Sequence, residues 1–276
     1  MSVKIVVDSS VDLIPEVKGQ VKTVALSVLF GEQEYKDGVT INPEEFYEML
    51  VESETLPTTS QPTPAAFEDA YRELVEAGHE VLVITVGSKL SGTYQSATIA
   101  AEEFPGKVLV LDSRTVAIGS ALLAKSALKL AEEGLSAQQI LEVLMEKRKK
   151  VRLYAMVDTL EYLKKGGRLS SAVAFVGGVL NLKPIISVED GELHVVGKAR
   201  GLKAAFAALT KACQDAGVNK AEPYMLGYTG TSDENLNKYM AENANLWPAD
   251  SDKLIIGSAI GTHAGPGAVA VAFYAE

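Results

Sequence analysis

The sequence predicts an α/β protein built from two closely packed parts. In the first half, short apolar runs alternate with helical patterns, which is typical of βαβ units around a mostly parallel sheet with flanking helices. In the second half, strand signals follow one another, including the tight-turn pair Asp190-Gly191, and they favour a mixed α+β arrangement. A chain of 276 residues is long enough for one large or two moderate domains.

The first half is predicted to alternate strands with helices. Its strands are runs rich in Val, Ile and Leu, at residues 3–7, 21–30, 81–86 and 108–111. Three helices begin where a capping residue or a proline opens the first turn, at 42–45, 63–64 and 91–93. The second and third of these end near residues 77 and 104, each followed by a glycine. Two longer helices are expected at about 117–133 and 137–149.

The second half is predicted to contain strands at residues 153–157, 185–188, 193–196, 224–228, 254–260 and 268–273. Helices are expected just before residue 166, over 202–216 and over 233–245. We place the domain boundary near Thr159, which gives an N-terminal α/β domain over 1–158 and a C-terminal α+β domain over 159–276. Because no flexible linker separates the two domains, a cleft or tunnel between them is the default ligand site.

The composition excludes several classes of protein. The net charge is −10 and the isoelectric point is about 5.0, which argues against generic binding to nucleic acid or to an anionic membrane. Cys213 is the single cysteine and cannot form an internal disulfide, and no Cys/His cluster or carboxylate ladder indicates a metal site. The sequence has no Walker loop to hold a nucleotide and no Gly-x-Ser-x-Gly elbow of a hydrolase, and no cofactor is indicated.

Two segments bear on the location of the protein. The N-terminal residues begin a strand and lack the layout of a signal peptide, so a cytoplasmic location is expected. The uncharged stretch 254–275 has the length of a membrane span. Its clustered Gly and Pro residues instead favour two buried strands around a Gly-rich loop.

Hydroxyl side chains gather where ligands bind in parallel α/β sheets, beyond strand ends and before helices. The groups are Ser9-Ser10, Thr58-Thr59-Ser60, and Ser88 with Ser91-Gly92-Thr93. Ser91 and Thr93 stand at a predicted helix N-terminus, where hydroxyls and free N–H groups can hold an anion. From the residues alone, an N-cap role for Ser91 is the favoured alternative. The proline-containing loop 58–64 is expected to be rigid enough to position a donor, although a plain helix-entry loop fits equally well.

The Gly-rich segment 261–267 around His263 is the sharpest single feature. Its three glycines would let the backbone approach a ligand closely, and a histidine there can donate to an anion or move a proton. A structural histidine in a turn is the alternative. Arg168 and Arg200 lie next to glycines, and each guanidinium could hold a phosphate or carboxylate or lie in solvent near a helix end. Ser91 with His263 could also imitate a hydrolase pair, without an identifiable third partner.

Six motifs follow one another along nearly the whole chain. They are Asp8-Ser9-Ser10-Val11-Asp12-Leu13, Thr59-Ser60-Gln61-Pro62, Leu90-Ser91-Gly92-Thr93-Tyr94-Gln95-Ser96-Ala97, Gly166-Gly167-Arg168-Leu169, Leu182-Lys183-Pro184-Ile185, and Gly261-Thr262-His263 with Gly265-Pro266-Gly267-Ala268. Each motif is weak alone, but in this order they resemble the DegV family of bacterial fatty-acid-binding proteins. The sequence departs from that pattern where Ala270 and Ala272 occupy a tail that is often richer in glycine.

The resemblance implies a two-domain DegV-like fold with one long-chain fatty acid in a tunnel between the domains. It implies that Thr59 and Ser91, together with Gly92 and Thr93, bind the fatty-acid carboxylate. The residues that match the surrounding ligand loops are Ser60, Gln61, Gly265 and Gly267. Three basic residues match those that, in the family, face a phosphate group and a partner protein, both described in the next paragraph. They are Arg168, Arg200 and His263. The uncharged segments 117–124 and 171–182 are candidates to line the tunnel.

The resemblance also implies a role. Better-known family members are the fatty-acid-binding subunit of a bacterial fatty acid kinase, in which a separate ATP-binding subunit converts the bound acid to an acyl phosphate. The chain would then be no enzyme by itself, with no catalytic residue, metal or cofactor, and would contact a membrane at most transiently to exchange acid. Burying about fourteen methylenes at roughly 0.8 kcal/mol each supplies about 11 kcal/mol before the costs of binding.

Two rival functions stay open at this point. One is an acyl-ester hydrolase with Ser91 as nucleophile and His263 as base. The other is a lipid-storage or regulatory module that binds the same ligand and has no kinase partner.

Overall fold

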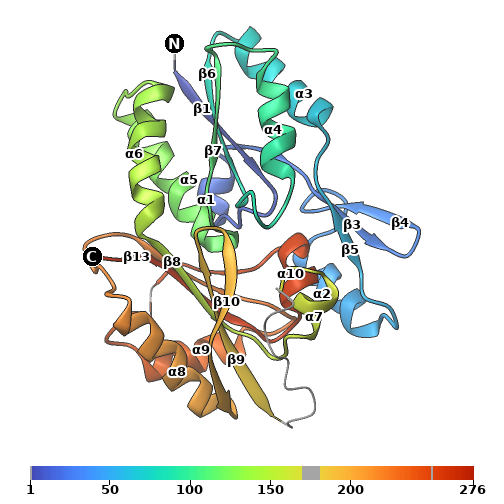
Figure 1. The fold of residues 1–276 in the computed structure, drawn as a ribbon, viewed down its shortest axis with the longest axis vertical. Coiled ribbons are helices and arrows are strands. Elements are labelled where there is room, and N and C mark those ends of the chain that lie inside the picture. The colour runs from blue at the N-terminus through green and yellow to red at the C-terminus, as the bar shows by residue number, and fades with distance from the viewer. Residues whose placement is uncertain (1, 170–180, 250) are drawn as a thin grey trace.

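The computed structural model describes residues 2–169, 181–249 and 251–276 and arranges them around three β-sheets (Figure 1). A four-stranded sheet lies in the upper half of the view, and a six-stranded sheet lies below it. The third sheet is small and lies at one side. This two-domain α/β architecture confirms the predicted fold class.

The four-stranded sheet is parallel throughout, as predicted. Its strands are ordered β2 (Lys22–Val24), β1 (Val3–Asp8), β6 (Glu80–Thr85) and β7 (Val108–Asp112). Successive strand residues point to opposite faces, so Val6 and Val83 pack on one side while Ile5 and Ile84 pack on the other. The helices on the first side are α3 (Pro64–Glu76) and α4 (Thr93–Ala101), and those on the second are α5 (Ala117–Glu132) and α6 (Ala137–Lys150).

The six-stranded sheet is mixed. Its strands are ordered β10 (Glu192–Arg200), β9 (Leu182–Glu189), β8 (Val151–Met156), β13 (Val269–Tyr274), β11 (Tyr224–Tyr228) and β12 (Lys253–Ile255). Only the β11–β12 pair is parallel. The predicted tight turn between β9 and β10 is confirmed, because Asp190 and Gly191 have φ of 48° and 77°, the left-handed values that this turn requires.

Helices cover both faces of the six-stranded sheet. On the outer face lie α8 (Leu202–Asp215) and α9 (Glu234–Glu242), which pack on Tyr154, Val271 and Phe273. On the inner face lies α5, which also packs on the four-stranded sheet. Helix α5 therefore occupies the space between the two sheets and belongs to the core of both.

The third sheet corrects one prediction. Residues 21–30 were expected to form a single strand, but the chain turns at Ala25-Leu26, where the Leu26 N–H donates to Ser9 Oγ (3.0 Å). The second part becomes β3 (Ser27–Phe30), which pairs antiparallel with β4 (Gln33–Lys36) and β5 (Thr58–Ser60). Propensity alone could not locate this turn, because a contact with the first strand's loop stabilises it.

The C-terminal region corrects a second prediction. Residues 254–260 were expected to be a strand, but β12 ends at Ile255 and helix α10 (Ser258–Ala264) follows. The carboxylates of Asp12 and Asp37 accept from the N–H groups of Gly257 (2.7 Å) and Ser258 (3.1 Å) and satisfy the helix start. These acids come from the first forty residues, so no local pattern could reveal the helix.

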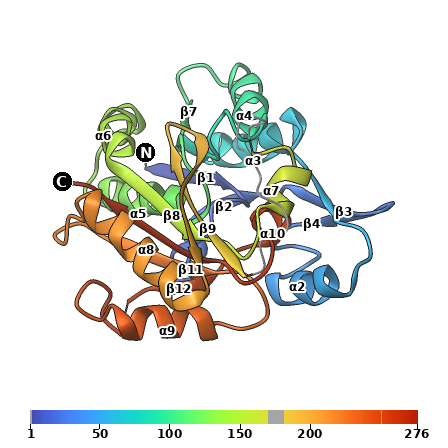
Figure 2. The same ribbon diagram turned by 60° about the horizontal axis from the view of Figure 1, so that its bottom comes forward.

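Helix α10 lies with the remaining short helices at one side of the molecule, next to the small sheet (Figure 2). The neighbours of α10 there are α2 (Pro43–Glu52) and α7 (Glu161–Lys165). The last short helix, α1 (Pro15–Lys18), follows β1 in the chain. The predicted capping box at the start of α2 is confirmed, since Asn42 and Glu45 exchange side-chain to backbone hydrogen bonds. Across the described ranges, no helix combines the length and the hydropathy that a membrane span needs.

Strand β8 bears on the domain boundary. It is hydrogen-bonded to β13 and β9, although the predicted boundary near residue 159 assigns it to the first domain. We propose that the second domain begins near Val151, where α6 ends and the chain enters the six-stranded sheet.

Candidate functional site

A cavity of about 890 Å³, including its opening, lies over the inner face of the six-stranded sheet. Most of the side chains that line it are apolar and come from the sheet, the start of α5 and helix α10. The polar side chains on its wall are Ser10, Thr59, Ser91, Arg168, Thr229 and His263. The cavity therefore suits a largely apolar ligand with a localised polar group.

Four of these polar residues form a group at one end, drawn from four separate segments. Thr59 Oγ1 and His263 Nε2 lie 3.0 Å apart, which joins β5 to α10. The Arg168 Nε–H donates to the Leu90 carbonyl (3.2 Å), which brings the segment after α7 beside Ser91. We call Thr59, Ser91, Arg168 and His263 the polar end of the cavity.

Arg168 carries a charge that no acid among the described residues compensates. Its Nη1 donates to the Gly166 carbonyl (2.7 Å) and its Nε to Leu90, and within the described ranges it forms no ion pair. A half-buried guanidinium beside an apolar cavity favours an anion, because burial weakens its interaction with water. The polar end is therefore suited to a carboxylate or a phosphate.

Arg168 also lies at the boundary between the cavity and solvent. A second, polar hollow adjoins the cavity and shares Leu90, Arg168 and Leu193 with it. The rest of this hollow is lined by the β9–β10 hairpin, the loop before α4 and Gly167 after α7, and its exposed residues are Lys89, Gly167, Glu192 and His194. The charged end of the cavity thus faces its opening.

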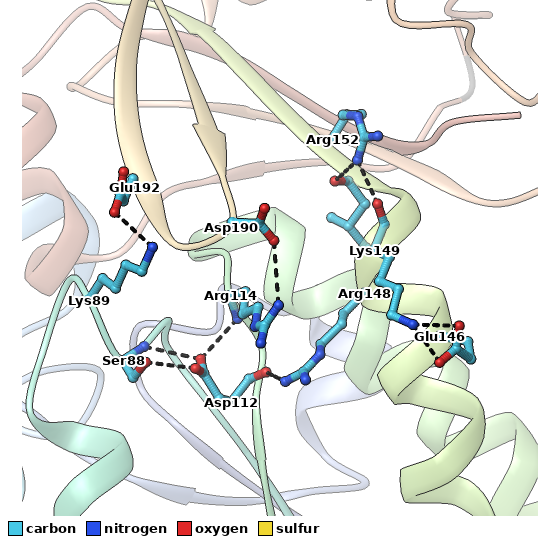
Figure 3. Close-up of polar contacts among 11 residues, drawn as sticks. Ser88, Lys89, Asp112, Arg114, Glu146, Arg148, Lys149, Arg152, Asp190 and Glu192 are labelled. Atoms are coloured by element: carbon cyan, nitrogen blue, oxygen red, sulfur yellow. Dashed lines mark hydrogen bonds and ion pairs between the residues drawn. The ribbon is translucent and has the colours of Figure 1, made fainter.

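The β9–β10 hairpin closes over the cavity and is tied to the loops of the parallel sheet (Figure 3). Glu192 pairs with Lys89 (2.7 Å) and Asp190 with Arg114 (3.5 Å) at the tip of the hairpin. Asp112 accepts from Ser88 Oγ (2.7 Å) and holds both loops together. The ion pairs are exposed and stabilise the closed hairpin only modestly.

His263 is neutral over the physiological pH range. Burial lowers its pKa to about 4, and the positive charge of Arg168 adds to this effect. Its Nδ1 is buried and has no hydrogen-bond partner among the described residues. Gly166 backs the ring so closely that a Cβ at residue 166 would overlap Nδ1. His263 can therefore donate one hydrogen bond but carries no charge.

Ser91 differs from the N-cap that the residues alone favour. The N-cap position of α4 is Gly92, but Ser91 Oγ accepts from the Thr93 N–H at the helix start (3.3 Å), so part of the predicted capping role is present. The same hydroxyl lies 2.9 Å from Thr93 Oγ1, and Ser91 lines the cavity. A Cβ at Gly92 would overlap Gln61 Oε1. Gln61 in turn donates from Nε2 to Ser96 Oγ (2.9 Å). This contact fixes the loop of Thr59 relative to the start of α4.

The other predicted site residues support the polar end or lie apart from it. Thr93 is buried behind Ser91, and Ser60 is exposed in β5. Gly265 has φ of 70° and packs against the ring of Tyr162, while Gly267 has φ of 85° next to Asp158.

Arg200 is exposed at the end of β10 and is not among the residues that line the cavity. Of the two segments expected to line a tunnel, 117–124 contributes Ala117. Most of the other, 171–182, lies outside the described residues.

Sequence reasoning placed Ser10 among the hydroxyls at strand ends without giving it a role, and it missed Thr229 and the small side chains on the sheet. Ser10 reaches the cavity while its hydroxyl bonds the carboxylate of Asp8, whose pKa burial raises to about 6. Ala268 and Ala270 line the cavity from β13 and its preceding residue. The alternation Ala-Val-Ala-Val-Ala at 268–272 could have predicted a sheet face of small side chains, because every second residue of a strand faces the same side.

Comparison with known proteins places the whole chain in one family. The model of a family described as "Uncharacterised protein, DegV family" matches residues 2–276. A DegV domain-containing protein of Deinococcus radiodurans is 38% identical over 279 residues, covering 99% of this chain and 98% of the relative.

Solved structures agree with that match. A Thermus thermophilus DegV family protein, whose structure is described as fatty acid binding, superposes with a TM-score of 0.89 at 33% identity, covering 100% of both chains. A stearic acid-binding protein from Eubacterium ventriosum superposes with a TM-score of 0.86 at 31% identity, covering 98% of both chains.

The environment of His263 predicts its titration. Its imidazole should titrate near pH 4 by NMR, because burial and Arg168 both disfavour the charged form. Since the folded-state pKa lies below the unfolded value, His263 contributes stability above about pH 6.5 that is lost as the pH falls through 4. Arg168→Ala should raise the midpoint, whereas Lys211→Ala, an exposed change on α8, should leave it unchanged. A midpoint near 6.5 in the unmodified protein would contradict the assigned burial.

Proposed function

Since this chain belongs to the DegV family, we propose that it binds one long-chain fatty acid in the cavity over its six-stranded sheet. The observation that carries the proposal is an apolar cavity whose polar end holds the hydroxyls of Thr59 and Ser91 and, near the opening, an arginine that forms no ion pair within the described residues. A fatty acid has the matching chemistry, because its chain gains about 0.8 kcal/mol for each buried methylene and its carboxylate needs donors. The fatty acids named for the Thermus thermophilus and Eubacterium ventriosum structures support the same ligand class.

In this proposal the hydroxyls of Thr59 and Ser91 donate to the carboxylate. Both line the cavity at its polar end, and the first turn of α4, with Gly92 and Thr93, adds the positive end of a helix. Neutral donors satisfy the carboxylate without a tight ion pair. Ser60, Gln61, Gly265 and Gly267 act indirectly, by holding the loops that carry the donors.

We further propose that the chain presents its ligand to a separate ATP-dependent kinase subunit. A carboxylate oxygen near the opening would attack the terminal phosphorus of ATP, the bond to ADP would break, and an acyl phosphate would remain. Arg168 lies where it would stabilise the added negative charge. Neutral His263 would donate from Nε2 to Thr59 Oγ1, which leaves the Thr59 hydroxyl proton free for the ligand's oxygens. Arg200, on the exposed end of β10, would contribute to the partner surface. In this role the chain itself catalyses nothing and works in the cytoplasm, with at most transient membrane contact.

The geometry favours this proposal over an ester hydrolase. His263 Nε2 is hydrogen-bonded to Thr59, whereas the Ser91 hydroxyl faces Thr93. In the described part of the chain, no carboxylate is hydrogen-bonded to His263 Nδ1, so the ring lacks the orienting third group of a catalytic triad. A lipid-storage or regulatory protein would use the same cavity. The phosphorylation assay below is the measurement that distinguishes this function from that of a kinase subunit.

Mass spectrometry of the purified protein tests the ligand class. We expect an organic extract of the denatured protein to contain a stoichiometric fatty acid. If the protein is empty and also fails to bind added palmitate or oleate, the proposal is wrong.

Substitution of the two hydroxyl donors tests the carboxylate site. Thr59→Ala and Ser91→Ala should each weaken fatty-acid binding by about tenfold or more, because a hydrogen bond to a charged group contributes roughly 1.5–3 kcal/mol. Thr58→Ala is the matched control, since Thr58 precedes Thr59 in β5 but is exposed and does not line the cavity. Unchanged affinity in the Thr59/Ser91 double variant would remove these residues from the site.

Arg168→Ala separates binding from presentation. We expect fatty-acid affinity to change by less than about fivefold, since the apolar wall supplies most of the binding energy. Acyl phosphate formation with ATP and a kinase subunit of the source bacterium should fall by at least about tenfold, because a charge-assisted contact to the phosphate is lost. Lys211→Ala removes a positive charge from the distant helix α8 and should change neither quantity. Equal rates of acyl phosphate formation with the Arg168→Ala variant and with the unmodified protein would show that this arginine has no role in the reaction.

A further inference from the structure

The inner face of the six-stranded sheet presents its side chains in rows that run across the strands. Cross-strand pairing aligns one row as Ile186, Ala155, Ala270 and Gly227, from β9, β8, β13 and β11. The next row is Val188, Leu153, Ala272 and Met225. Small residues occupy the middle of the first row, whereas a leucine stands in the middle of the second.

These rows lie in a definite order relative to the polar end. The end of β8 and the start of β13 lie nearest the polar end. The chain runs from β8 through Val157 and α7 to Arg168, and it runs from His263 of α10 through Ala268 into β13. Leu153 is four residues before Val157, which places it about 13 Å farther along the sheet. The cavity thus extends from the polar end, past the alanines, to Leu153.

Leu153 is where the cavity stops. Leu153 and Val188 line it, but their row neighbours Ala272 and Met225 do not. Helix α5 closes the space above Leu153, since a Cβ at Gly119 would lie 3.3 Å from Leu153 Cδ1. Beyond Leu153 the same face of the sheet is filled by Tyr274, whose hydroxyl donates to the Leu122 carbonyl of α5 (3.1 Å).

We propose that Leu153 limits the length of the acyl chain that this protein accepts, and this inference rests on the fatty-acid binding proposed above. The alanine pair Ala155 and Ala270 leaves room for the chain on the sheet, and the isobutyl group of Leu153 meets its methyl end. Carbon beyond that point would have to displace Leu153 against Gly119, where the helix backbone leaves no space.

The test is a chain-length profile of binding, measured with saturated fatty acids from ten to twenty-two carbons. Leu153→Ala should shift the longest acid bound by about three carbons, the difference between the two side chains, with affinity rising about fourfold for each added methylene that becomes buried. Leu153→Val is a milder variant in case the alanine variant does not fold, and it should shift the limit by about one carbon. Ala270→Val should act in the opposite sense and shorten the longest acid bound.

Leu209→Ala is the matched control, because Leu209 is a buried residue of α8 in the core on the opposite face of the sheet, and the change removes the same atoms there. It should lower stability while leaving the profile unchanged. If the unmodified protein binds fatty acids but the Leu153 and Ala270 variants keep its chain-length limit, the assignment of Leu153 is wrong. If the unmodified protein binds no fatty acid of any length, the proposed function fails instead.

Discussion

The unequal size of the side chains on the two faces of strands β8 and β13 determines where this molecule can hold a ligand. The outer face carries Tyr154, Val271 and Phe273, which fill the space beneath α8 and α9. The inner face carries Ala155 and Ala270, and both line the cavity. A dense core on one side and a cavity on the other follow from the same alternation of residues.

The polar end depends on close approaches between segments that are far apart in sequence. Gly92 admits Gln61 and thereby holds the Thr59 loop against α4, and Gly166 admits the ring of His263. A side chain at Gly92 would displace the end of the Gln61 side chain, and one at Gly166 would displace the buried imidazole of His263. The arrangement keeps one cation and several neutral donors at the opening of an apolar cavity, which suits an anionic head group that must stay accessible.

Local patterns in the sequence predicted the parallel sheet, the Asp190-Gly191 hairpin and the alternation of strands and helices. For Thr59, Ser91, Arg168 and His263 the local patterns left structural alternatives open, and the resemblance to the DegV family selected these residues. The structure brings all four to one cavity. Where prediction failed, contacts distant in sequence decided the outcome. Asp12 and Asp37 stabilise the start of α10 from the other end of the chain, and the turn at Ala25-Leu26 depends on Ser9. Arg200 lies away from the cavity because its strand carries it to the sheet edge.

The position of α5 between the two sheets has a consequence for folding. Ile118, Leu122 and their neighbours on this helix contribute to the packing of both sheets at once. Neither half can lose its structure without exposing apolar surface of the other, so the two domains should unfold in a single cooperative transition rather than one after the other. The two structural domains of this protein therefore form one cooperative unfolding unit.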